Sequence, residues 1–448
     1  MAAVSPARAA AFDILMAVER GSAHSDDLLR GKKVAMLSAA DRHLTTALVL
    51  GVLRWQIRLD QELQALLARP NGKLDAEVRV ALRLGAFQLR SMDRIPARAV
   101  IDESVEIAKQ SGHHFASRMV NAVLRKLASA LQIDWPEGTP RELALAQAHP
   151  AWMVERWADF YGLDATRAIC AHDQSQPVQA VRLVDGATEE ELVASAVVLE
   201  PGRLLTRARR VIAGDVPATG AFHEGRTALQ DEGSQLVAEL LGRGDTILDC
   251  CAAPGGKTLI LAERNPAASI EACETSETRM ARLKERLAVL GDRVAFRLAD
   301  AASIQDENAF DLALADVPCS GTGTLRRNPE IRHRLHVEDL ARQAERQKSI
   351  LHAAVRAVRS RGHVVYSTCS LEPEENEHVV AAVLAEHKGI QVVPMQLRIE
   401  EMRKAGVLTR PGAEGLKGCV TPEGALRLLP GKFDTDGFFV ALLEKVDG

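Results

Sequence analysis

The chain of 448 residues lacks several features that would assign it to a protein class at once. It contains no Cys-x-x-Cys pair, which argues against a structural zinc site. No apolar run approaches the roughly 18 residues that a membrane helix needs, and residues 47–53 form one of the longest. Near the start, Asp13 interrupts the one stretch that resembles the apolar core of a secretory signal. We therefore expect a protein without a membrane segment or a secretion signal.

Cysteine and histidine usage indicates a reducing compartment and no metal. The seven cysteines are an odd number and do not follow the spacing of a disulfide framework. Reduced thiols are therefore predicted, in a cytoplasmic protein. A monomer is a separate expectation, which the cysteines do not bear on. The 13 histidines, among them the pair His113–His114, have no partners at the spacing of metal ligands.

The net charge of −4 would by itself argue against a nucleic-acid partner. The charge is unevenly distributed, because residues 1–130 sum to +6, whereas residues 131–230 and 231–448 sum to −5 each. A basic region of this kind is where contacts with phosphates are expected. Charges scattered by chance over a solvated helical surface are the alternative.

The amino-terminal third has the pattern of a helical bundle. Apolar residues recur at spacings of three and four in four segments, at 9–18, 44–67, 78–89 and 115–127. Pro96, between the third and fourth segments, is interpreted as a helix stop. Beyond residue 130, a cluster of turn-forming residues predicts a domain boundary: Pro136, Gly138, Pro140 and Pro150.

The remainder of the chain alternates between strand and helix patterns. Residues 177–184 have strand character and residues 189–198 helical character, which predicts a small α/β unit. Further on, helical segments separate five apolar strand-like runs, at 246–249, 269–272, 294–297, 312–315 and 363–366. This alternation predicts a doubly wound, Rossmann-like α/β domain with a parallel sheet and helices on both faces. The predicted domains are 1–132, 133–230 and 231–448.

A glycine-rich segment, Cys251-Ala-Ala-Pro-Gly-Gly-Lys-Thr258, follows the first strand of the predicted sheet. Its small residues let backbone amides approach a ligand, and the next helix offers its amino terminus. Glu274 lies near the end of the second strand, where a carboxylate can accept hydrogen bonds from ribose hydroxyls, and Asp300 can flank an adenine. A P-loop is excluded, because that motif requires glycine at the position of Cys251. We predict a nucleotide site, with a simple tight turn as the alternative.

Two cysteines stand in segments that follow predicted strands. Cys319 lies within Asp316-Val-Pro-Cys-Ser-Gly-Thr-Gly323, and Cys369 lies within Tyr366-Ser-Thr-Cys-Ser370. Because the carboxyl ends of parallel strands meet at one edge of the sheet, both side chains should converge over the nucleotide site. The thiolate is a strong nucleophile, which suggests an enzyme that attacks a poorly reactive ring. Burial as small apolar residues is predicted for four other cysteines, Cys170, Cys250, Cys273 and Cys419.

With these segments, the chain resembles the RNA 5-methylcytosine methyltransferases, and among them the bacterial enzymes that modify 16S ribosomal RNA. The motifs that carry the resemblance span nearly the whole chain: Gln230-Asp-Glu-Gly-Ser-Gln235, 249–258, 316–323, 366–377 and Asp436-Gly-Phe-Phe439. The amino-terminal bundle resembles the NusB antitermination factor, an RNA-binding helical fold. This second resemblance agrees with the basic charge of residues 1–130.

The resemblance implies S-adenosyl-L-methionine as the cofactor and a role for individual residues. Cys369 would be the nucleophile, Cys319 would act in release of the methylated product, and Asp316 would complete the catalytic set. The residues implied to hold the cofactor are Cys251, Ala252, Ala253, Pro254, Gly255, Gly256, Lys257, Glu274, Asp300 and Asp316.

The implied reaction suits the chemistry of cytosine. Its C5 atom is not nucleophilic enough to take a methyl group directly, but a thiolate added at C6 turns C5 into an enamine-like carbon that can. The reaction also needs an acid that hydrogen-bonds N3, a base that removes the C5 proton and a positioned methyl donor. The target base must leave its stack to reach a buried thiolate, so unpaired or remodelled RNA is expected.

Two other functions remain open at the level of sequence. A transfer RNA cytosine methyltransferase would use the same core, and only the analogy with the basic bundle favours 16S ribosomal RNA. A noncatalytic RNA-binding or antitermination module would retain a degenerate cofactor fold, which the intact Cys319, Cys369 and Asp316 argue against. Eight arginines could extend a basic track toward the cleft: Arg203, Arg207, Arg209, Arg210, Arg326, Arg327, Arg332 and Arg334.

Overall fold

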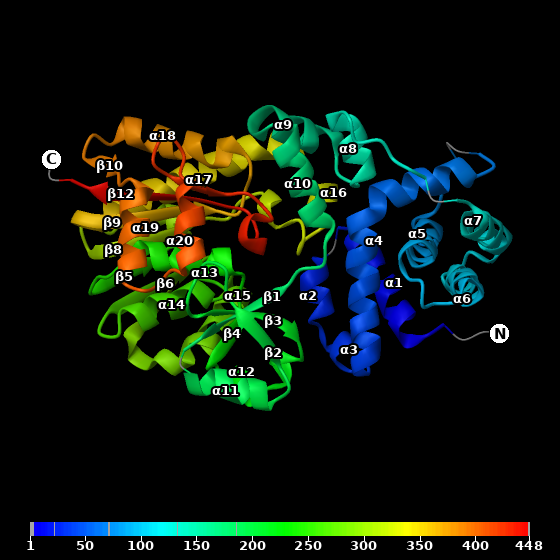
Figure 1. Ribbon diagram of the computed structural model, residues 1–448, viewed down its shortest axis with the longest axis horizontal. Coiled ribbons are helices and arrows are strands. Elements are labelled where there is room, and N and C mark those ends of the chain that lie inside the picture. The colour runs from blue at the N-terminus through cyan, green and yellow to red at the C-terminus, as the bar shows by residue number, and fades with distance from the viewer. Residues whose placement is uncertain (1–3, 22, 70–71, 132, 185, 447–448) are drawn as a thin grey trace. The chain divides into compact units, whose positions relative to one another are not determined.

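The computed structural model describes residues 4–446, apart from residues 22, 70–71, 132 and 185 (Figure 1). By packing, the chain falls into two compact units. Unit 1 comprises residues 1–175 and 325–334, and unit 2 comprises residues 176–324 and 335–448. The domain boundaries after residues 132 and 230 remain a prediction. None of the helices that the structure describes is long and apolar enough to cross a membrane.

Unit 1 consists of helices, as predicted. Its elements are α1 (Pro6–Glu19), α2 (Ser25–Leu29), α3 (Lys32–Ala35), α4 (Ala39–Leu66), α5 (Ala76–Ser91), α6 (Ala97–Gln110), α7 (Ser117–Ser129), α8 (Pro140–Ala146), α9 (Ala151–Tyr161), α10 (Leu163–Gln174) and α16 (Ile331–Arg334). The four segments predicted from apolar spacing lie in α1, α4, α5 and α7. Pro96 lies between two helices, as predicted, and is the N-cap residue of α6, because a residue without an N–H is tolerated where a helix begins. Helix α6 itself was not predicted.

The core of the bundle is formed by the apolar faces of α1, α4, α5, α6 and α7. Leu48 on α4, Leu82 on α5 and Leu124 on α7 are among its fully buried side chains. Helices α4 and α5 approach closely at Gly51, where a Cβ atom would overlap the ring of Phe87. The absence of a side chain at Gly51 therefore sets the spacing of these two helices.

Residues 325–334 belong to unit 1, although in the chain they follow a strand of unit 2. Arg332 in this segment is buried and donates hydrogen bonds to the carbonyl oxygens of Arg54 and Ala148, both at 3.0 Å. Burial lowers the pKa of Arg332 to about 10. This arginine of the predicted basic track is therefore part of the interior of unit 1.

Two further arginines of the predicted track pair with carboxylates of unit 2. Arg209 makes a two-pronged contact with Glu189, at 2.6 and 2.8 Å. Arg210 contacts Glu200 at 2.7 Å. Since these cations already have protein partners, the predicted track is not a row of unpaired charges.

Unit 2 begins with a small antiparallel sheet in the order β2-β3-β1-β4. Its strands are β1 (Gln179–Leu183), β2 (Val198–Pro201), β3 (Ala208–Ala213) and β4 (Thr227–Leu229), accompanied by α11 (Gly186–Ala194) and α12 (Gly220–His223). The sheet has its own apolar core, which includes Val181 and Leu192. The predicted small α/β fold is thus confirmed.

The large sheet of unit 2 has the order β10-β12-β9-β8-β5-β6-β7, with β11 paired to β12. Its strands are β5 (Thr246–Asp249), β6 (Ser269–Glu274), β7 (Val294–Leu298), β8 (Phe310–Asp316), β9 (Val358–Thr368), β10 (Ile390–Val392), β11 (Leu426–Leu428) and β12 (Phe438–Lys445). The five predicted strands are β5 to β9, and they pair in parallel. The last three strands, which were not predicted, pair antiparallel and make the sheet mixed.

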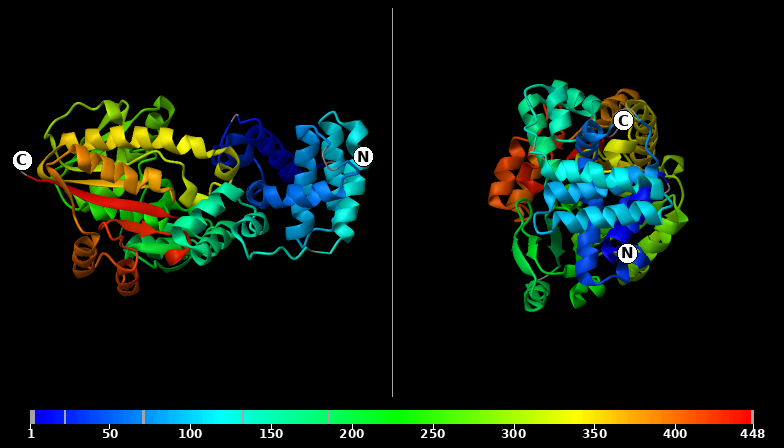
Figure 2. Two further views of the ribbon diagram at one scale, coloured as in Figure 1. Left: turned by 90° about the horizontal axis from the view of Figure 1, so that it is seen from above. Right: turned by 90° about the vertical axis from the view of Figure 1, so that its right-hand side faces the viewer.

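Helices cover both faces of the large sheet because its strands are apolar on both sides. Along β12, Val440 and Leu442 face one core, whereas Ala441 and Leu443 face the other. Helices α17 and α18 lie side by side over the second core (Figures 1 and 2). The helices of unit 2 are α13 (Glu232–Leu241), α14 (Gly256–Arg264), α15 (Glu277–Leu287), α17 (Val337–Ala357), α18 (Glu377–Glu386), α19 (Met395–Lys404) and α20 (Arg410–Lys417).

The close approach at Gly51 predicts a stability effect. Gly51→Ala should lower the free energy of unfolding by about 1–3 kcal/mol, because the added methyl group displaces the buried ring of Phe87. Urea denaturation followed by circular dichroism measures the change. Adding Phe87→Leu should restore part of the loss, since it removes the overlapping ring atoms. A Gly51→Ala protein as stable as the original would contradict this account of the α4–α5 contact.

Candidate active site

The predicted site residues lie where the parallel strands of unit 2 end. Strands β8 and β9 are neighbours, and Asp316 at the end of one pairs with Ser367 on the other. Cys319 follows the end of β8 by three residues, and Cys369 follows the end of β9 directly. The loops are also joined downstream, because the Gly323 N–H donates a hydrogen bond to the carbonyl oxygen of Cys369 at 2.8 Å. Strand pairing therefore brings together two segments that are 50 residues apart.

The sulfur atoms of Cys319 and Cys369 are 3.4 Å apart, a hydrogen-bonding distance for a thiol. The hydrogen bond to Cys369, reinforced by burial and by the negative charge of Glu375, raises the pKa of Cys319 well above that of a free thiol. The raised pKa favours the thiol form of Cys319, and either sulfur can be the donor in the contact between them.

A cavity of about 350 Å³ lies beside the two sulfurs. Seven predicted site residues line it: Cys251, Ala253, Glu274, Asp300, Asp316, Cys319 and Cys369. Other lining residues, which were not predicted, include Arg279, Arg346 and Ile350. The cavity thus combines carboxylates from several strand ends with both cysteines.

The rest of the glycine-rich loop lies around a smaller neighbouring cavity of about 130 Å³. Ala252, Pro254, Gly256 and Lys257 line it. Gly255 has a conformational role, because it is the N-cap residue of α14 with φ +96°, a region that favours glycine. The predicted cofactor residues are thus divided between two adjoining cavities and a turn.

Lys257 forms an ion pair with Asp316. Its Nζ atom is 2.6 Å from Asp316 Oδ2, and the Ser367 hydroxyl donates to the other carboxylate oxygen at 2.6 Å. Burial alone would lower the pKa of Lys257, but the charge and hydrogen bond of Asp316 raise it overall, with a contribution from Cys369. Lys257 is therefore a half-buried cation that interacts with Asp316 and Cys369 together.

The next residue of the loop also has a partner inside the protein. Thr258 donates a hydrogen bond to Asp249 Oδ2 at 2.8 Å, and both side chains are buried. Burial raises the pKa of Asp249 to about 6, against the lowering effect of this hydrogen bond. Lys257 is paired with Asp316, and Thr258 is hydrogen-bonded to Asp249. The two side chains are therefore not placed as the Lys-Thr pair of a phosphate-binding P-loop would be.

The remaining cysteines are distinct from the pair at the strand ends. Cys170, Cys250 and Cys273 are buried, and Cys419 is half-buried. Burial raises the pKa of Cys273 to about 11 and also raises that of Cys170 and Cys250. These thiols are un-ionised at neutral pH, which agrees with packing roles.

Sequence reasoning missed a buried carboxylate beneath the two cysteine loops. Glu375 belongs to a single 3₁₀ turn (Pro373–Glu375) that precedes α18, and it is fully buried. Ser320 and Ser370, the residues directly after the two cysteines, both donate hydrogen bonds to it. The repeated Cys-Ser pair was visible in the sequence, but its common partner was not.

The donor set of the larger cavity is compatible with S-adenosyl-L-methionine. Glu274 is buried at the end of β6, and its carboxylate accepts a hydrogen bond from the Ser276 N–H at 2.9 Å, which leaves further acceptor positions for ribose hydroxyls. Asp300 is exposed after β7 and anchors its own turn through the Ala302 N–H. Ile350 adds an apolar wall on which an adenine can pack.

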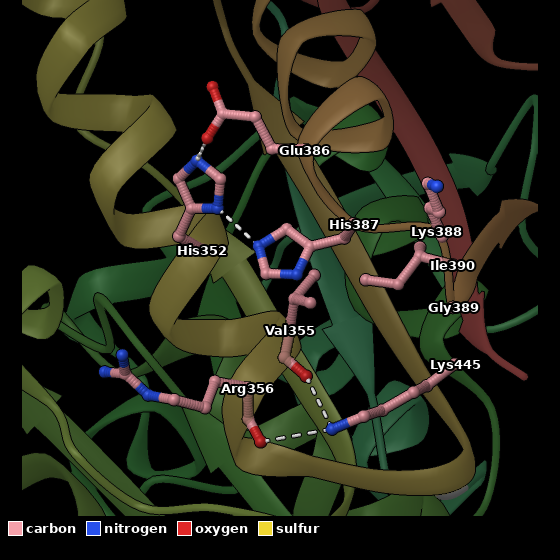
Figure 3. A pocket seen from close by; sticks show the side chains of 9 residues that line it. All are labelled: His352, Val355, Arg356, Glu386, His387, Lys388, Gly389, Ile390 and Lys445. Atoms are coloured by element: carbon pink, nitrogen blue, oxygen red, sulfur yellow. Dashed lines mark hydrogen bonds and ion pairs between the residues drawn. The ribbon is translucent and has the colours of Figure 1, made fainter. Parts of the chain in front are cut away.

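A second depression in unit 2, of about 630 Å³, contains none of the predicted residues (Figure 3). There, His352 Nδ1 is 2.7 Å from His387 Nε2, and His352 Nε2 is 3.0 Å from Glu386 (Figure 3). Lys445 points its ammonium at backbone carbonyl oxygens, including that of Val355 at 3.3 Å (Figure 3). These polar groups bind one another or the backbone, as is typical of a cluster that connects neighbouring helices.

The parallel strands, the loop after β5 and the carboxylates at the following strand ends define the class of S-adenosylmethionine-dependent methyltransferases. The family model described as 16S rRNA methyltransferase RsmB/F matches residues 240–444, and that of the NusB family matches residues 5–129.

Similar proteins extend over the full chain. The probable ribosomal RNA small subunit methyltransferase B of Bacillus subtilis (strain 168) is 33% identical, covering 97% of this chain and 98% of the relative. The ribosomal RNA small subunit methyltransferase B of Pseudomonas syringae pv. tomato is also 33% identical, covering 98% and 97%. The solved structure of PH0851 has a TM-score of 0.79 at 24% identity, covering 99% of this chain and all of that chain.

The chain belongs to the 16S rRNA methyltransferase RsmB/F family. The predicted resemblance is thereby confirmed, as are the NusB-type helical fold and the methyltransferase fold. S-adenosyl-L-methionine is the cofactor, as predicted. The protein is an RNA methyltransferase.

The buried Asp249 predicts a pH-dependent difference in stability. Because its pKa is raised to about 6, its favourable contribution is complete below about pH 4 and is lost as the pH rises through 6. Asp249→Asn keeps an acceptor for Thr258 but removes the ionisation. The variant should therefore gain up to roughly 3 kcal/mol relative to the original between pH 4 and 7. Urea denaturation of both proteins across this range tests it, and a pH-independent difference would contradict it.

Proposed function

We propose that the protein methylates C5 of a cytosine in 16S ribosomal RNA through a covalent bond between Cys369 and C6 of the base. The observation that carries this proposal is the pair of sulfurs 3.4 Å apart beside Asp316, in one cavity. A packing role for either cysteine would not require the second sulfur, the carboxylate and the cavity together. The similar proteins that are named ribosomal RNA small subunit methyltransferase B support ribosomal RNA of the small subunit as the substrate.

In the proposed reaction, the thiolate of Cys369 forms a bond to C6, and the electrons of the C5–C6 double bond move to C5. The cofactor, when bound, supplies an electrophilic methyl group to that carbon. Removal of the C5 proton then restores the double bond and expels Cys369 as a thiolate. The ammonium of Lys257, which interacts electrostatically with Cys369, favours the charged form of the sulfur at both stages.

Asp316 and Lys257 are proposed to act as one unit on the polar edge of the base. The 2.6 Å ion pair provides an acceptor and a proton-bearing group at one point of the cavity wall. A hydrogen bond from this pair to N3 withdraws electrons from the ring and makes C6 more electrophilic. The residues that would hold the cofactor are Cys251, Ala252, Ala253, Pro254, Gly255, Gly256, Glu274 and Asp300, with contributions from Lys257 and Asp316.

Cys319 is proposed to act in release. Once the Cys369 sulfur is bonded to C6, Cys319 loses the hydrogen bond that is the largest cause of its raised pKa and can release its proton to solvent. Its thiolate then lies near C5 of the attached base, where it can accept the C5 proton. Its thiol can also hydrogen-bond the sulfur that departs from C6, which stabilises the leaving thiolate. Both effects concern steps after methyl transfer.

RNA recognition is proposed to begin at the basic amino-terminal bundle, with its net charge of +6 over residues 1–130. The target cytosine must leave its stack to enter the cavity. Bisulfite sequencing of total RNA from a strain without the gene identifies the substrate. A lost signal in 16S ribosomal RNA supports the proposal, whereas a lost signal in transfer RNA alone would overturn the substrate.

Replacing the proposed nucleophile should abolish the reaction. Cys369→Ala is expected to form no detectable 5-methylcytosine, because no thiolate can add to C6, while binding of S-adenosylmethionine is retained. Mass spectrometry of ribosomal RNA from cells with only this variant measures the modification, and calorimetry measures cofactor binding. Full modification by the variant would refute the covalent mechanism.

Replacing the second cysteine should have a different effect. Cys319→Ala is expected to slow product release by at least about 100-fold, so that a covalent protein–RNA adduct accumulates. Incubation with RNA and cofactor followed by a denaturing gel reveals the adduct as a slowly migrating band. The double variant with Cys369→Ala is the control and should give no band. Normal turnover without an adduct would mean that the release role is misassigned.

A further inference from the structure

The two cysteine loops share a buried anchor. Ser320 donates to Glu375 through its backbone N–H at 2.8 Å and through its hydroxyl, and Ser370 donates through its hydroxyl. The two serine hydroxyls are themselves 2.9 Å apart. Each of these serines directly follows a cysteine in the chain. The carboxylate of Glu375 therefore binds the neighbour of each cysteine.

A third element is tied to the same carboxylate. The side-chain amide of Gln347 on α17 donates to Glu375 Oε1 at 2.8 Å and to the carbonyl oxygen of Pro318 at 3.0 Å. Glu375 and Gln347 are both fully buried. A buried carboxylate that accepts four hydrogen bonds holds its donors far more rigidly than a solvated one, since any donor that leaves remains unsatisfied.

We propose that Glu375 is a positioning residue that clamps the Cys319 and Cys369 loops together and so sets the reactive spacing of the two sulfurs. The proposal rests on the roles proposed above for the two cysteines. Strand pairing of β8 and β9 ends at Asp316 and Ser367, before the cysteines, so strand hydrogen bonds alone do not hold the sulfurs in place. Beyond the strand ends, the Gly323 N–H bonds to the carbonyl oxygen of Cys369, and the carboxylate of Glu375 joins the residues that directly follow the two cysteines.

The clamp also distinguishes the two cysteines electrostatically. The negative charge of Glu375 is one of the causes that raise the pKa of Cys319, after the hydrogen bond to Cys369 and burial. Lys257, of opposite charge, interacts with Cys369 instead. A negative charge favours the thiol form and a positive charge favours the thiolate form.

Two substitutions of Glu375 distinguish the effect of its hydrogen bonds from the effect of its charge. Glu375→Ala removes all four hydrogen bonds and releases the loops. Glu375→Gln can still accept from the Ser320 N–H and from Gln347, while the serine hydroxyls rotate to accept from its amide, so the loops stay joined without the charge. Glu386→Gln is the control. Glu386 is the last residue of α18, at the opposite end of that helix from Glu375, and contacts His352 of α17 at 3.0 Å (Figure 3).

Disulfide formation measures the spacing of the sulfurs without any RNA. Diamide takes two electrons and two protons from a thiol pair, becomes its hydrazine and leaves a disulfide, for which the sulfurs must close from 3.4 Å to about 2.05 Å. The original protein, Glu375→Gln and Glu386→Gln should form the Cys319–Cys369 disulfide at similar rates. Glu375→Ala should form it at least about tenfold more slowly, because the sulfurs are no longer held in contact. Peptide mass spectrometry follows the bond.

Methylation and alkylation provide the functional readouts. Glu375→Ala should lower kcat for methylation by about 100-fold, with KM for the cofactor unchanged within about twofold, and Glu386→Gln should change neither. In Glu375→Gln, the pH midpoint for alkylation of Cys319 by iodoacetamide should move to lower pH, since a negative charge has been removed. A purely structural role would not move this midpoint.

The outcomes separate this proposal from the proposed function. Rapid disulfide formation in Glu375→Ala would overturn the clamp whether or not the protein methylates cytosine. If Glu375→Ala does not fold, Ser370→Ala replaces it in the disulfide assay, because it removes the hydrogen bond from the Cys369 loop to Glu375, and disulfide formation at the original rate would overturn the clamp. If neither the original protein nor any variant methylates RNA, the proposed function fails. Slow disulfide formation in Glu375→Ala would still support the clamp in that case.

Discussion

The parallel pairing of β8 with β9 is the constraint on which the site depends. With Asp316 opposite Ser367, the register makes both strands end at the same edge of the sheet. The two loops that leave this edge then carry Cys319 and Cys369 to within 3.4 Å. A shift of the register by one residue would turn Asp316 to the other face of the sheet and separate it from Lys257 on α14.

Buried charges impose a second constraint on the same edge. Lys257 is half-buried as a cation because Asp316 compensates it at 2.6 Å, whereas the fully buried Asp249 forms no ion pair among the described residues and its pKa is raised to about 6. The protein thus keeps one carboxylate in an ion pair and a second one buried without one in the described part of the chain. The first can interact with a polar ring, and the second fixes the turn after β5 through Thr258.

Local pattern predicted the five parallel strands and the helical bundle, because apolar periodicity depends on each segment alone. It placed seven site residues that line one cavity, since side chains after parallel strands share an edge. It missed β12, although the motif around 436–439 leads into it, because antiparallel pairing to β9 depends on residues some 70 positions away. The contact of Lys257 with Asp316 and the anchor at Glu375 escaped for the same reason.

Two cysteines with identical side chains can perform different steps only if their surroundings differ. Cys319 interacts with the carboxylate of Glu375, and Cys369 interacts with the ammonium of Lys257. The carboxylate contributes to raising the pKa of the first thiol, the ammonium interacts favourably with the second, and a hydrogen bond links the two sulfurs. The proposed division of labour between the cysteines therefore rests on charges contributed by α14 and by the turn before α18.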